Sequence, residues 1–112
     1  MKKELLELAL DQINFEFESS YLYLSMSAWA QENGYPGTAK WMEKQAEEEI
    51  SHGKKMMHFL QEINERVILT PVAAGPVDFP GFMELFKLSL EHEKKVTARI
   101  VKLYEEATAA KE

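Results

Sequence analysis

The sequence contains no cysteine, few prolines and glycines (four and five in 112 residues) and no excess of basic side chains. Without cysteine, disulfides, thiolate nucleophiles and sulfur-ligated metal sites are excluded, and the composition suits a reducing compartment. No apolar run approaches the length that spans a membrane, and Glu4, Glu7 and Asp11 interrupt the apolar stretch that an export signal requires. We therefore expect a cytoplasmic protein.

Acidic residues outnumber basic ones, with 19 Asp and Glu against 13 Lys and Arg, which gives a net charge of −6 at pH 7. This balance argues against a nucleic-acid partner, because such a binder needs a basic face, and no membrane partner is expected. Hydrophobic residues make up 46% of the chain, as in ordinary soluble globular domains. At this length we expect one domain, residues 1–112, that buries roughly two-thirds of its unfolded surface.

The sequence predicts three long helices. Asn33 and Gly34 form a usual helix end, and Pro80 suits the first turn of a helix. We therefore expect helices over about residues 2–32, 37–65 and 80–110.

The segment 66–79 is predicted to be a long crossover, because Pro71, Gly75 and Pro76 prevent a regular helix there. At about 3.3 Å per residue it spans roughly 45 Å, and a helix of about 28 residues is roughly 42 Å long. The crossover can therefore run the length of the bundle and start the third helix beside the start of the second. The expected fold is an all-α, up-down helical bundle.

Apolar residues at a seven-residue spacing mark the inward side of each helix, which is typical of near-parallel bundles. Three glutamates, Glu16, Glu49 and Glu93, fall on these sides, each near the middle of its helix. A carboxylate in a core is unfavourable unless a cation neutralises it, and no Lys or Arg lies on these sides. Bound metal is therefore the hypothesis to test. For the third helix the predicted inward residues are Phe82, Phe86, Ser89, Glu93, Val96, Ile100 and Tyr104.

The three glutamates are also expected at one height, together with a histidine. His52 follows Glu49 by about one helical turn, and an antiparallel pairing of the first two helices sets it beside Glu16. A crossover of full length brings Glu93 to the same layer. For any single carboxylate, a polar core residue that fixes helix register is the commoner explanation. Three at one level, with a histidine one turn away, favour a metal site.

Three further side chains need an interpretation. Tyr23 lies two turns from Glu16 on the inward side, where it can hydrogen-bond a metal ligand or donate one electron. A tyrosine at the edge of the core is the simpler alternative. His58 and His92 are both predicted to face solvent.

The first helix has a second apolar side, formed by Leu8, Phe15, Leu22 and Trp29. A helix that is apolar on two sides is buried on two sides, and three helices cannot easily cover both. We therefore expect the chain to self-associate through this side, as a homo-oligomer. The alternative is that the segment 66–79 covers it.

Three motifs occur in order along nearly the whole chain. They are the run NFEFESSYLYLSMSAW over residues 14–29, AEEEISH over 46–52 and LEHEKKVT over 90–97. The first resembles the first helix of bacterial non-haem ferritins. The others resemble the A-x-E-E-x-x-H motif of their second helix and the H-E-x-x-V-T motif of their third.

This resemblance implies an iron site. It implies that Glu16, Glu49 and His52 hold one iron, and that Glu49 bridges to a second iron held by Glu93. It also implies that Tyr23 lies beside this di-iron centre. The implied activity is a ferroxidase, which oxidises Fe(II) with O₂ or peroxide, and the ferric mineral is then stored inside a hollow shell of subunits.

The family continues into a fourth long helix with further iron ligands and a short fifth helix, whereas this sequence ends where its third helix would end. We therefore expect another chain to cover the side of the bundle that exposes Ile100 and Tyr104. We expect only one iron site to be complete within a single chain. The leading alternative is a non-catalytic helical assembly module with vestigial ligands. A carboxylate-metal enzyme with some other substrate ranks last, because no substrate pocket is recognisable.

Overall fold

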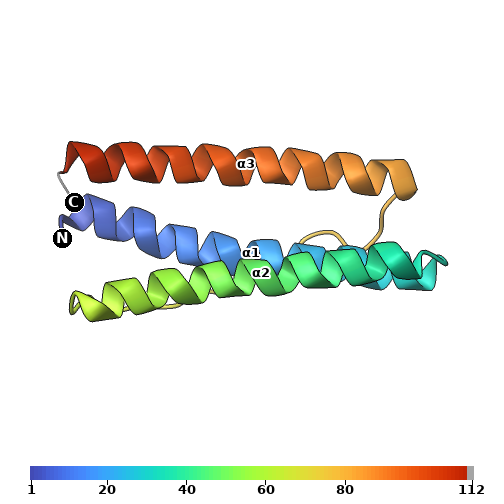
Figure 1. The fold of residues 1–112 in the computed structure, drawn as a ribbon, viewed down its shortest axis with the longest axis horizontal. Helices are drawn as coiled ribbons and strands as arrows, with labels where there is room; N and C mark the ends of the chain where they lie inside the picture. Colours follow the sequence, from blue (N-terminus) through green and yellow to red (C-terminus); the bar gives the residue numbers. More distant parts are fainter. Residues whose placement is uncertain (111–112) are drawn as a thin grey trace.

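A computed structural model, which describes residues 1–110, shows three long helices in an elongated bundle of 48 × 21 × 20 Å. They are α1 (Lys3–Glu32), α2 (Pro36–Glu62) and α3 (Phe82–Ala109) (Figure 1). The all-α bundle with a long crossover is thus confirmed. The largest shift in a boundary is at the end of α2, which stops at Glu62 and not near residue 65. In the described part of the chain, no helix is long and apolar enough to cross a membrane.

The first two helices form a tight antiparallel hairpin. Gly34 adopts a φ of 86°, in the left-handed region that glycine tolerates best. The N–H of Tyr35 donates to the carbonyl of Ala30 at 2.8 Å, which satisfies one of the free carbonyls at the end of α1. Pro36 then begins α2, where its missing N–H costs no helical hydrogen bond. This short turn fixes the register at which α1 and α2 pack side by side.

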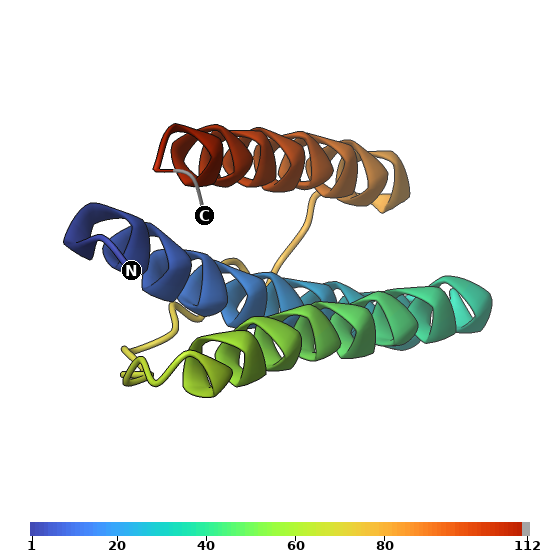
Figure 2. The same cartoon turned by 60° about the vertical axis from the view of Figure 1, so that its left-hand side comes forward.

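The crossover is held against the outer side of α1 by polar contacts. The side-chain amide of Asn14 donates to the hydroxyl of Thr70 at 2.8 Å and to the carbonyl of Pro71 at 3.0 Å. Further along, the hydroxyl of Ser25 donates to the carbonyl of Pro76 at 2.7 Å. The segment therefore travels the length of the bundle, and α3 starts near the start of α2, as predicted (Figures 1 and 2).

The second apolar side of α1 is covered within the chain. Phe15 is buried and stacks on His92 of α3, with 5.3 Å between the ring centroids. Trp29 packs edge to face on Phe79, which lies at the end of the crossover, with 6.1 Å between the ring centroids. Leu8 and Leu22 are half-buried. At Phe15 and Trp29 this side is therefore covered within the chain, by α3 and by the end of the crossover, and self-association through its half-buried residues stays a prediction.

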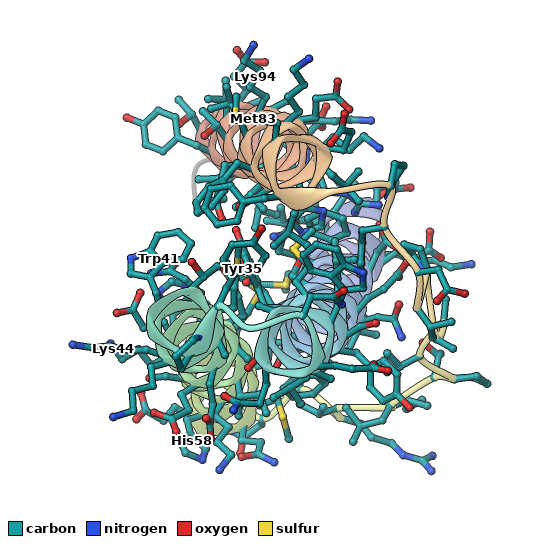
Figure 3. The ribbon with its side chains drawn as sticks, turned by 90° about the vertical axis from the view of Figure 1, so that its right-hand side faces the viewer. Tyr35, Trp41, Lys44, His58, Met83 and Lys94 are labelled. Carbon is teal, nitrogen blue, oxygen red and sulfur yellow. The ribbon has the colours of Figure 1, made fainter. Side chains whose placement is uncertain are left out.

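The inward side of α3 also differs from the prediction. The buried residues of α3 are Leu85, Ser89, His92 and Val96. By contrast, Phe86, Ile100 and Tyr104 are 37%, 49% and 72% exposed. The reason is that, among the described helices, the backbone of α3 comes close to that of α1 alone, so the buried residues of α3 lie on the face turned toward α1. Viewed end-on, α2 and α3 stand apart with Tyr35 and Trp41 between them (Figure 3).

Candidate metal centre

Two carboxylates and an imidazole converge between α1 and α2 at mid-height. Glu16 comes from α1, and Glu49 and His52 come from one face of α2, three residues apart. One ligand atom from each of the three residues lies within 4.8 Å of the other two. Nδ1 of His52 is 3.8 Å from Oε2 of Glu16 and 3.6 Å from Oε2 of Glu49. The antiparallel hairpin thus places the three residues together, as the sequence predicted.

The two carboxylates are buried and incompletely satisfied. Glu16 and Glu49 are 3% and 4% exposed, and within residues 1–110 neither has a Lys or Arg partner. Gln12 donates from Nε2 to Oε1 of Glu16 at 3.0 Å. The Oε2 atoms of both glutamates have no hydrogen-bond partner among the described residues. Buried polar atoms nearly always have a hydrogen-bond partner, so these two oxygens indicate a bound proton or cation.

The raised pKa of Glu49 also indicates that a proton or a cation neutralises this cluster. Burial, and after it the neighbouring carboxyl groups of Glu16 and Glu93, raise the pKa of Glu49 to about 9. Without a cation, Glu49 is therefore protonated at neutral pH. A divalent ion between the two carboxylates would replace that proton and occupy the unpaired oxygens.

The ligand types narrow the choice of ion. Carboxylates with one imidazole suit iron, manganese or zinc. Three protein ligands also leave coordination positions for water or a small oxidant. The side chain of His52 is 54% exposed, so the cluster reaches solvent on this side. The residues therefore fit an accessible transition-metal site.

Glu93 and Tyr23 form a second, adjoining pair. The Tyr23 hydroxyl donates to Oε1 of Glu93 and lies 3.5 Å from the hydroxyl of Ser89. Tyr23 is fully buried, and its pKa is raised chiefly by that burial and then by the bond to Glu93. Glu93 lies outside the group of three that converges on α2. The predicted layer of four ligands is therefore a group of three with Glu93 beside it.

The prediction that both histidines face solvent is confirmed for His58 and wrong for His92. His58 is exposed on the far side of α2 from α3 (Figure 3). His92 is buried, and its Nε2 lies 2.7 Å from the hydroxyl of Ser19. Burial lowers the pKa of His92, which favours the neutral ring. The available signal was the spacing of Ser89, His92 and Val96, which also fits one helical face.

Comparisons with known proteins show which family and fold the chain resembles. A model of the ferritin-like domain family matches residues 6–112. A bacterial non-heme ferritin of Staphylococcus epidermidis is 36% identical over 105 residues, which are 94% of this chain and 63% of the relative. A probable bacterial non-heme ferritin-like protein of Haemophilus influenzae is 35% identical, over 92% of this chain and 62% of its own length.

Solved structures show the same likeness. An open pore ferritin from the hyperthermophilic archaeon Archaeoglobus fulgidus superposes with a TM-score of 0.96 at 37% identity. The match covers 99% of this chain and 68% of that one. The present chain thus spans under two-thirds of the length of the two bacterial relatives and slightly more of the archaeal one.

Proposed function

Because this chain belongs to the ferritin-like family, we propose that it binds Fe(II) through Glu16, Glu49 and His52 and oxidises it for storage. The proposal depends mainly on the buried Oε2 atoms of Glu16 and Glu49. Both atoms lack a hydrogen-bond partner among the described residues, and both lie near the imidazole of His52. The relatives named as non-heme ferritins support iron as the substrate. The cytoplasmic location that the sequence predicts also suits a protein that handles Fe(II).

In this proposal the carboxylates favour oxidation because their negative charge stabilises Fe(III) more than Fe(II). Glu49 uses its two oxygens to hold two iron ions close together, the second of them beside Glu93. Two Fe(II) ions each lose one electron, and one O₂ molecule takes up both electrons and two protons to become hydrogen peroxide. When only one Fe(II) is bound, Tyr23, whose hydroxyl is bonded to Glu93, would supply the second electron and release its proton, so that O₂ still receives two electrons.

The second iron position needs ligands beyond Glu93, and we propose that another chain supplies them. The open side between α2 and α3 is the surface available for that contact. Trp41 (47% exposed) meets the ring of Phe86 across this side, and Ile100 (49%) follows Phe86 by two heptads on the same face of α3. Exposed apolar side chains gathered on one side mark protein interfaces. A homo-oligomer joined through this side would cover the core and complete the site.

The iron chemistry is tested by adding Fe(II) without oxygen, measuring binding by calorimetry, and then admitting air. We expect stoichiometric binding followed by a rise in near-ultraviolet absorbance from Fe(III). Glu49→Ala should lose both, whereas Glu48→Ala, an exposed neighbour on the same helix, should keep both. Binding without oxidation would favour a non-catalytic assembly module. Absence of Fe(II) binding would refute the proposed function.

The assembly is tested by measuring the mass of the chain in solution by sedimentation. We expect a mass above that of one 12.9 kDa chain. Ile100→Lys should lower it, because a charge is placed on the open apolar side. His58→Lys, on the exposed far side of α2, is the matched control and should leave the mass unchanged. A monomer before any substitution would contradict completion by a second copy.

A further inference from the structure

Gly53 of α2 lies at a helix contact too close for any side chain. A Cβ atom placed on its backbone would be 2.6 Å from Cε1 of Phe17 on α1, and 3.1 and 3.2 Å from two further ring atoms. Carbon atoms at optimal contact are about 3.5–4.0 Å apart. The hairpin therefore reaches this separation only because residue 53 is glycine.

Phe17 cannot simply turn away to make room. Its ring is half-buried and packs against the cluster of Ala9, Ile13 and Leu60, which joins α1 to α2. Protein cores are close-packed, so a ring that leaves this cluster must displace its neighbours or leave a void. A methyl group at position 53 would therefore either shift Phe17 or push the two helices apart.

The contact lies next to the candidate metal ligands on both helices. Phe17 directly follows Glu16, Gly53 directly follows His52, and Glu49 lies one helical turn before Gly53. The ligand atoms from the two helices must meet within 4.8 Å, so their convergence depends on how closely α1 and α2 approach here. Metal sites require ligands placed to within about 0.5 Å.

We propose that Gly53 is a positioning residue, which sets the separation of α1 and α2 at which Glu16 meets Glu49 and His52. The inference rests on the metal-binding function proposed above and adds a residue that binds no metal itself. Any side chain at position 53 weakens metal binding through the spacing of the helices, without removing a ligand.

Gly37 offers a matched control in the same helix. Apart from its chain neighbours and the nearby backbone of its own helix, no atom of the described residues lies within 4 Å of a Cβ placed there, and the residue is exposed in the first turn of α2. Alanine favours helix over glycine at both positions, so helix propensity predicts a gain in stability for both substitutions. Only Gly53→Ala adds a clash, so a difference between the two variants isolates the spacing effect.

The test is calorimetric binding of Co(II), a redox-inert probe under these conditions, to the full chain. We expect Gly53→Ala to weaken binding by about tenfold or more, because a small displacement of ligands has a large effect on a preorganised site. Gly37→Ala should bind as the unsubstituted chain does. Phe17→Leu removes the ring atoms that clash, so adding Gly53→Ala to Phe17→Leu should cost less than about threefold.

Each outcome separates the spacing inference from the function on which it rests. If the unsubstituted chain binds Co(II) and Gly53→Ala binds equally well, the inference alone is overturned. An equal loss with and without Phe17→Leu also overturns it, because the effect is then not a clash with the ring. If Gly53→Ala does not fold by circular dichroism, the comparison of Phe17→Leu with the double variant decides in the same way. An unsubstituted chain that binds no Co(II) overturns the metal-binding function and this inference together.

Discussion

The two sides of α1 hold their partner helices in different ways. Toward α2 the backbones approach so closely that Gly53 leaves no room for a side chain, and three candidate ligands converge there. Toward α3 the contact is a single buried face. The more complete half of the candidate iron site thus lies on the tight interface, and Glu93, on the looser helix, stands outside it.

The side of the bundle between α2 and α3 is only partly closed. At one end, aromatic rings bridge the two helices. The ring centroids of Tyr35 and Phe82 are 4.7 Å apart, and those of Trp41 and Phe86 are 6.4 Å apart. At the other end the helices leave an apolar pocket of about 480 Å³, whose lining includes Leu60 of α2. The bundle is therefore closed on the α1–α2 side and open between α2 and α3.

The largest expected effect concerns the single face by which α3 is attached. Leu85→Ala should destabilise the chain by about 2–5 kcal/mol, because Leu85 is fully buried and truncation leaves a cavity. Leu90→Ala, on the same helix but 59% exposed, should change stability by less than about 0.5 kcal/mol. Urea denaturation followed by circular dichroism measures both. Similar effects for the two leucines would contradict the one-sided packing of α3.

A smaller effect is expected at the contact between Tyr23 and Glu93, which joins the two regions. Tyr23→Phe should lower the free energy of unfolding by about 1–3 kcal/mol, since it leaves a partly buried carboxyl oxygen of Glu93 without its donor. Tyr21→Phe, at a position of α1 that is 52% exposed, is the control and should be neutral. Thermal unfolding of the metal-free chain reports the difference. A neutral Tyr23→Phe would show that this bond does not hold α3 in place.

The smallest effect, taken per unit of pH, is the dependence of the stability of the metal-free chain on the protonation of Glu49. Burial and the neighbouring carboxyl groups raise the pKa of Glu49 from its ordinary value of 4.5 to about 9, so the folded chain keeps a proton that the unfolded chain loses. Stability is therefore highest below pH 4.5 with respect to this group, and falls as the pH rises toward 9. Glu49→Gln should remove this slope, which is at most about 1.4 kcal/mol for each unit of pH. Glu48→Gln, which is exposed, should retain it, and a slope of opposite sign would refute the assignment.

The same contrast explains which buried faces and contacts could be predicted from the sequence. On α1 and α2 the spacing of apolar residues identified the buried faces, and the short turn at Gly34 fixed the register that joins Glu16 to His52. On α3 two overlapping faces fit the pattern, one through Ser89 and Glu93 and one through Ser89 and His92. Which is buried depends on the surfaces against which α3 packs, and that is a tertiary property. The closeness of Gly53 to Phe17 was likewise invisible, because it depends on the distance between two backbones.

The central claim is that the buried carboxylates of Glu16 and Glu49 exist to hold a cation with His52. The most direct measurement is an anomalous difference map from crystals soaked in Fe(II) without oxygen. The account predicts a peak bonded to oxygen atoms of both glutamates and to a ring nitrogen of His52. A map with no peak there, while both carboxylates are satisfied by basic or hydrogen-bonding neighbours, would contradict it.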